Sequence, residues 1–177
     1  FAQVRIRVVP RQRGAGNEFR SALPEGHPAE VFLPAITEAV TGGLGAGVAF
    51  GHPVVDVLVE LVEAEVREGQ ASDIAFRNAV MQAIRQACEA GQPLLLEPIM
   101  RVEIIIPEEF LGEVIGDFNA RRGKIEALQT RSGARVISGL APLSGMFGYA
   151  TALRSAPQGR GTFTMVFHQF GPAEKGS

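Results

Sequence analysis

The chain has 177 residues, which is enough for two small domains. Hydrophobic residues make up 46% of it and charged residues 20%, and the net charge of −2 excludes a bulk attraction to nucleic acid or anionic lipid. The single cysteine, Cys88, excludes an intrachain disulfide, and no apolar run approaches the roughly 20 residues that cross a bilayer. Any contact with RNA must therefore come from local groups of basic residues.

The first half of the chain predicts a mixture of strands and helices. Residues 1–9 alternate apolar and polar side chains, which indicates a strand that already begins at the first residue, so we expect further structure upstream. A glycine-bearing connection over 10–17 precedes a helix from Pro34, which should fray or turn at the glycines of 42–47. Residues 53–62 are rich in Val and Leu and predict a second strand.

A long helix is predicted over 73–90. Ser72 is a suitable N-cap, and Gly91 and Pro93 lie beyond the expected end. The core-facing stripe should hold Ile74, Met81, Ile84 and Cys88, with Phe76, Val80 and Ala87 beside it. Cys88 on such a stripe is typical of a small core residue rather than a nucleophile.

The second half follows a different order of elements. An alternating strand up to Ile106 leads through Pro107 into a helix with the apolar face Leu111, Val114, Ile115 and Phe118. Two strands over 125–130 and 134–141 are linked by a hairpin-like turn at 131–133. A second helix carrying Leu143, Met146, Phe147, Ala150 and Leu153 precedes a strand over 161–170 with Phe163, Met165 and Phe167 on one side.

This order, strand–helix–strand–strand–helix–strand, is that of the ferredoxin-like fold. The predicted fold class is therefore α+β with two domains. We expect the first over residues 1–95, the second over 96–172, and a disordered tail over 173–177.

No pattern predicts a catalytic or metal site. A phosphate-binding loop of the Gly-x-x-x-x-Gly-Lys-[Ser/Thr] type is absent, and the chain has only two lysines, Lys124 and Lys175. His27, His52 and His168 lack metal-ligand spacing and are interpreted as structural residues. We expect this chain to bind no cofactor or metal and to be no enzyme by itself.

Two groups of basic residues are the candidates for binding RNA. They follow the two predicted helices of the second half and comprise Arg121, Arg122 and Lys124, and then Arg154 and Arg160. Arginines beside glycines, where a backbone can approach closely, suit phosphate contact. Basic residues at helix C-termini also stabilise the helix dipole, so the residues alone leave both interpretations open.

Several motifs resemble the signature of elongation factor G in order and spacing. They are Leu-Glu-Pro-Ile-Met at 96–100, Gly-Glu-Val-Ile-Gly-Asp at 112–117, Asn-x-Arg-Arg-Gly at 119–123, Met-Phe-Gly-Tyr-Ala-Thr-x-Leu-Arg-Ser at 146–155 and Gln-Gly-Arg-Gly at 158–161. In the first half, the strand at 54–56 and the helix entry at 75–76 are similar to domain IV of that family. The resemblance covers almost the whole chain.

The resemblance implies a role on the ribosome. The second half would be domain V, which in the family lies against the GTPase-activating rRNA of the large subunit. The first half would be domain IV, which has a left-handed crossover and reaches tRNA and mRNA at the decoding centre during translocation. The GTPase, with GTP and Mg, would belong to domains upstream of this chain. A cytoplasmic monomer that contacts no membrane is implied.

The implied tip of domain IV departs from the family pattern. The family has Tyr-His-Asp and then Asp-Ser-Ser, whereas residues 66–72 here place Arg67 at the His position, followed by Glu68, Gly69 and Gln70. A guanidinium differs chemically from a neutral imidazole, and another tip loop of the family would precede Phe1. An alternative is therefore a paralogue that acts in ribosome recycling or ribosome protection. A more distant alternative is a small-molecule regulatory module, although no convergent pocket is visible in the sequence.

Overall fold

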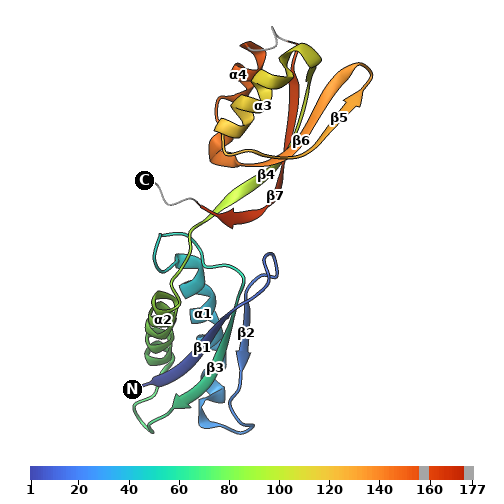
Figure 1. The fold of residues 1–177 in the computed structure, drawn as a ribbon. Helices are drawn as coiled ribbons and strands as arrows, with labels where there is room; N and C mark the ends of the chain where they lie inside the picture. The colour runs from blue at the N-terminus through green and yellow to red at the C-terminus, as the bar shows by residue number, and fades with distance from the viewer. Residues whose placement is uncertain (156–159, 174–177) are drawn as a thin grey trace. The chain divides into compact units, whose positions relative to one another are not determined.

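The computed structural model describes residues 1–155 and 160–173 and divides into two compact units, Phe1–Leu95 (unit 1) and Leu96–Ser177 (unit 2). Both units combine a sheet with helices, as the predicted α+β class requires (Figure 1). Of the tail predicted over 173–177, only the first residue is among those described, and the rest of that prediction lies outside them.

Unit 1 is a three-stranded sheet with two helices on one face (Figure 1). Its elements are β1 (Gln3–Pro10), β2 (Glu18–Ser21), a 3-10 turn (Pro28–Phe32), α1 (Leu33–Ala46), β3 (Val57–Glu65) and α2 (Asp73–Ala90). The strand order is β1-β3-β2, with β1 antiparallel and β2 parallel to β3. The crossover of this module thus joins two parallel neighbours, β2 and β3, through α1.

The prediction that α1 frays or turns at its glycines holds only for Gly47. The helix continues to Ala46 and ends at Gly47, where φ is 77°. Tertiary contact overrides the low helix propensity of glycine here: at Gly43 a Cβ atom would lie only 3.3 Å from Cδ1 of Ile84 in α2. The glycine therefore lets the two helices approach closely.

The bounds of α2 agree with the prediction, but its stripe agrees only in part, at Ile84 and Cys88. Ser72 Oγ accepts a hydrogen bond from the Ala75 amide at 3.2 Å, as an N-cap should. The buried row is Phe76, Val80, Ile84 and Cys88, whereas the predicted members Ile74 and Met81 are 71% and 46% exposed. The row begins at Phe76 because its ring stacks on Phe32, with centroids 4.7 Å apart. Cys88 is a core residue, and burial raises the pKa of its thiol.

Two features of the strands in unit 1 were missed. The four-residue β2 was predicted as part of no element, because it is too short to give a periodic signal. The strand predicted over 53–62 begins only at Val57, since Asp56 has a positive φ of 59° and turns the chain into β3.

Unit 2 is an antiparallel sheet in the order β5-β6-β4-β7, which confirms the ferredoxin-like prediction (Figure 1). Its elements are β4 (Leu96–Pro107), a 3-10 turn (Glu108–Phe110), α3 (Leu111–Ala120), β5 (Lys124–Arg131), β6 (Ala134–Pro142), a 3-10 turn (Leu143–Met146), α4 (Tyr149–Ser155) and β7 (Thr162–Pro172). Val102, Ile104 and Ile106 of β4 form the core with Val114 and Phe118 of α3 and with Tyr149 and Leu153 of α4. Ser132 and Gly133 both have positive φ, as a tight hairpin turn requires.

The second predicted helix of unit 2 is broken. A 3-10 turn ends at Met146, Phe147 is extended with φ −61° and ψ 132°, and α4 starts only after Gly148, where φ is 73°. Phe147 was predicted on the apolar face but is 72% exposed. Phe167 was predicted beside Phe163 and Met165 but is 55% exposed. It lies outside the core of unit 2, and its ring contacts that of Phe170.

Candidate nucleic-acid interface

The five predicted RNA-binding residues lie at two ends of unit 2. Arg121, Arg122 and Lys124 follow the end of α3, whereas Arg154 lies in the last turn of α4 and Arg160 precedes β7. The Arg121 guanidinium lies 5.1 Å from the ring centroid of Tyr149, the first residue of α4. Arg160 instead pairs with Glu109, ahead of α3, and lies 5.6 Å from the ring of Phe110. Because ten helical residues span about 15 Å, the basic residues form two groups rather than one patch.

Arg121 is hydrogen-bonded chiefly to groups of the protein itself. Its Nε donates to Asp117 Oδ2 at 2.9 Å, and its Nη1 donates to the carbonyls of Gly145 and Phe147, each at 3.0 Å. Only 20% of its side chain is exposed. These bonds join the end of α3 to the loop before α4, so most donors of this guanidinium are occupied by protein groups.

The glycines beside these arginines pack against protein. A Cβ atom at Gly123 would lie 2.5 Å from ring atoms of Phe118 and 2.6 Å from the Phe118 carbonyl oxygen. At Gly145 it would overlap the carbonyl oxygen of Arg121. The close approach that Gly123 permits is therefore made by Phe118 of the chain itself.

The other four basic residues differ in how far they are engaged. Arg122 pairs with Glu97, whose side chain is only 14% exposed, and Arg160 pairs with Glu109 at the surface. Lys124 and Arg154 are exposed, and the described residues provide neither side chain with a hydrogen bond or an ion pair. Lys124 and Arg154 are therefore the cations most readily available to a phosphate.

Tyr149, the only tyrosine of the chain, is buried next to Arg121. Its hydroxyl has no hydrogen-bond partner among the described residues. Burial, aided by the carboxylate of Asp117 and opposed by Arg121, raises the pKa of this hydroxyl to about 12.

This shift predicts how the stability of unit 2 depends on alkaline pH. Tyrosine in an unfolded chain ionises at about pH 10, so the contribution of Tyr149 to the free energy of unfolding should be fully present below that pH and be lost as pH rises from about 10 towards 12. Tyrosinate absorbance during an alkaline titration of the folded chain checks this. A midpoint at the unfolded value would contradict the burial of Tyr149.

The predicted tip residues of unit 1, 67–70, form a tight turn between β3 and α2. The amide of Gln70 donates to the carbonyl of Arg67 at 3.1 Å, and Gly69 has a φ of 72°. The Arg67 guanidinium lies 3.8 Å from the ring centroid of Phe1, and its Nε donates to Glu65 at 2.9 Å. Arg67 thus remains exposed on a supported turn, and the contribution of the Phe1 ring was not foreseen from the sequence.

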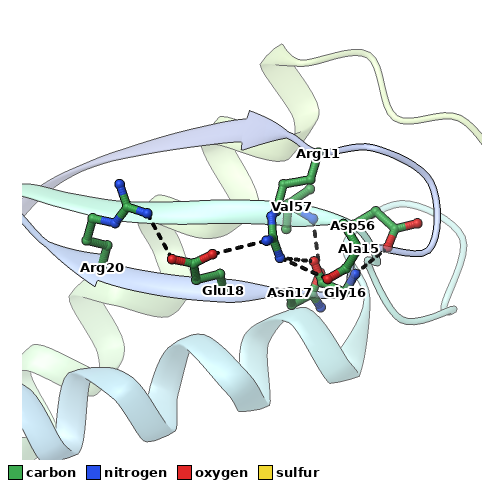
Figure 2. Close-up of polar contacts among 8 residues, drawn as sticks. All are labelled: Arg11, Ala15, Gly16, Asn17, Glu18, Arg20, Asp56 and Val57. Carbon is green, nitrogen blue, oxygen red and sulfur yellow. Dashed lines mark hydrogen bonds and ion pairs between the residues drawn. The ribbon is translucent and has the colours of Figure 1, made fainter.

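A polar network at the opposite end of unit 1 orders the connection from β1 to β2 (Figure 2). The two carboxylate oxygens of Asp56 accept from the amides of Gly14 and Gly16 at 3.0 and 2.8 Å. These bonds, that from Gly14 first, hold the pKa of Asp56 below its usual range. Arg11 Nη1 donates to the carbonyls of Ala15 and Gly16 at 3.0 and 2.8 Å. Sequence reasoning missed this network, since its groups are up to 42 residues apart.

Among residues 1–155 and 160–173, no three His, Cys, Asp or Glu residues are placed to hold a metal ion, and none of the helices is long and apolar enough to cross a membrane. His27 caps a 3-10 turn, its Nδ1 accepting from the Ala29 amide at 3.1 Å. Hollows of about 370 Å³ between α1 and α2 and about 360 Å³ between α3 and α4 contain none of the predicted site residues.

Comparison with known proteins covers both units. Residues 1–92 match the family model for elongation factor G, domain IV, and residues 94–176 match that for the elongation factor G C-terminus. A crystal structure of a protein from Thermus thermophilus is similar, with a TM-score of 0.85 and 27% identity over 97% of this chain and 26% of that one. The chain thus spans about a quarter of that protein's length. It belongs to the elongation factor G family, of which it carries domain IV followed by the C-terminal domain.

Proposed function

We propose that this chain is the ribosome-contacting part of a translation factor that drives movement of tRNA and mRNA with energy from GTP hydrolysis. The observation that carries the proposal is the presence of both family domains, in family order, over nearly the whole chain. GTP and Mg would be bound by other domains of the parent protein, which would act in the cytoplasm as a monomer. This chain itself would act by binding and position, without a catalytic residue.

The two units would contact different ribosomal sites. Unit 2 would meet the rRNA of the large subunit with the basic groups at its two ends, within which Lys124 and Arg154 are exposed and have no hydrogen bond or ion pair to the described residues. Structured RNA is recognised mainly by shape and by phosphate contacts, and separated cations on a rigid fold suit that mode. Unit 1 would bring the turn over 67–70 to tRNA and mRNA at the decoding centre.

The alternative of a recycling or ribosome-protection paralogue is favoured by Arg67. Its guanidinium carries a permanent charge where the family has an imidazole. It is stacked on Phe1 and bonded to Glu65. Restoring His at this position in the full-length parent separates the two functions. A main translocase should keep or gain translocation rate with Arg67→His, whereas a paralogue should translocate poorly with either residue and split ribosomes or displace an antibiotic instead.

Replacement of the accessible cations should change the salt dependence of ribosome binding. Lys124→Ala and Arg154→Ala should each weaken binding and reduce the slope of log K against log salt by about one, because each removes one phosphate contact. Affinity measured over a salt series checks this. Arg131→Ala is the matched control, since Arg131 is a similarly exposed cation of unit 2 at the hairpin turn, outside both groups. If the control lowers the slope as much as the other two variants, the assignment of the two groups fails.

A further inference from the structure

The loop between the 3-10 turn and α4 presents one aromatic ring to solvent. Phe147 is 72% exposed, more than any other aromatic side chain of residues 1–155 and 160–173. Its neighbours on either side of the loop, Met146 and Tyr149, are buried in the core of unit 2. The chain is therefore anchored before and after an exposed ring.

The loop is held in this conformation by groups outside it. Arg121 donates one hydrogen bond to the carbonyl of Phe147 and another to that of Gly145. Gly145 packs so closely on the Arg121 carbonyl that no Cβ fits, and Ser144 Oγ donates to Glu97 at 3.3 Å. A ring on a fixed loop loses little conformational entropy when it binds a partner, so its exposure is compatible with a preorganised contact.

The surroundings of Phe147 suit a nucleic-acid base better than a protein surface. Protein interfaces form around contiguous apolar patches that exclude water, but this ring has Ser144, Gly145 and Gly148 beside it in the sequence. The nearby Arg121 and Arg122 are each paired with a carboxylate of the protein. A phosphate is therefore a less suitable partner for this loop than a base. A base needs only one open aromatic face, and unpaired bases of folded RNA are commonly bound by stacking on Phe.

We propose that Phe147 stacks on one unpaired base of ribosomal RNA. The inference rests on the proposed ribosome binding and adds a contact that differs from the phosphate contacts of Lys124 and Arg154. Stacking releases no counterions and is indifferent to the identity of the base, so it should change affinity without changing the salt dependence.

The test compares ribosome binding by the 177-residue chain with Phe147→Leu, Phe147→Ala and Phe147→Tyr. Leu retains apolar area but has no ring, and Tyr keeps the ring. We expect Phe147→Leu and Phe147→Ala to weaken binding by about 5- to 150-fold, Phe147→Tyr to bind as the unchanged chain does, and the salt slope to be the same in all. Val31→Ala, which truncates a 74% exposed side chain of unit 1, is the control for loss of exposed apolar surface.

The outcomes separate this inference from the proposed function. Unchanged affinity of Phe147→Leu, while the parent chain binds, overturns the stacking contact and indicates either a protein partner that tolerates an aliphatic side chain or no contact. Failure of the parent chain to bind at low salt, both alone and rejoined to its GTPase domains, overturns both proposals. A photoreactive phenylalanine analogue at position 147 adds a second readout: cross-links to rRNA support stacking, and cross-links to ribosomal protein alone contradict it. Because the side chain is exposed, all variants should retain the circular dichroism spectrum of the parent chain.

Discussion

Gly123→Ala should destabilise unit 2 by about 2–3 kcal/mol, within the range for overpacking a filled site. The added Cβ would lie 2.5 Å from ring atoms of Phe118 and 2.6 Å from that residue's carbonyl oxygen. Phe118 is fully buried, and the Gly123 amide donates to the same carbonyl at 2.9 Å, so neither group can move away at little cost. Urea unfolding followed by the fluorescence of Tyr149 measures this effect, because the chain has no tryptophan and its only tyrosine lies in unit 2.

Gly116→Ala provides the matched control within the same segment. Gly116 lies inside α3, is exposed, and has no atom within 4 Å of the position that a Cβ would take. Replacing such a glycine should stabilise the helix by about 0.5–1 kcal/mol. Equal effects of the two substitutions would show that close packing at Gly123 does not contribute to the stability of unit 2.

Arg121→Ala should lower the free energy of unfolding of unit 2 by about 2–3 kcal/mol. It removes a charged hydrogen bond to Asp117 and leaves the carbonyls of Gly145 and Phe147 without their donor. Arg121→Lys should recover less than half of this loss, since one ammonium lacks the planar fork that reaches all three acceptors. The same tyrosine-detected urea unfolding measures both variants.

Arg131→Ala is the comparison for the loss of a cation as such. Arg131 lies 3.7 Å from Glu103, with 57% of its side chain exposed, and surface ion pairs of this kind contribute at most about 1 kcal/mol. A destabilisation by Arg121→Ala no larger than that of Arg131→Ala would mean that Arg121 is a surface cation, available for phosphate, and that the loop carrying Phe147 is held by other contacts.

Local sequence patterns correctly predicted those elements whose structure depends on neighbouring residues. The alternation up to Ile106 predicted β4, and Ser72 with Gly91 predicted both ends of α2, because strand periodicity and helix caps depend on neighbouring residues. The ferredoxin-like order of unit 2 followed from these local elements. The domain IV character of unit 1 came instead from the resemblance of its motifs to the family.

What was missed depends on contacts between residues far apart in the chain. Glycines at 42–46 predict a frayed helix until Ile84 is known to pack on Gly43. Phe147 fits an apolar helical stripe in the sequence, and only the donors of Arg121, 26 residues away, fix it in an exposed extended loop. The candidate site could be predicted only in part for the same reason. The sequence identified the basic residues, but not which of them are bonded to carboxylates or carbonyls of the protein.

The central claim, that this chain binds ribosomes through its basic groups, is tested most directly by titrating the labelled chain with bacterial ribosomes over a series of salt concentrations. We expect saturable binding that weakens as salt rises and that full-length elongation factor G displaces. Absence of binding at low salt, both for this chain and for the chain rejoined to its GTPase domains, would contradict it.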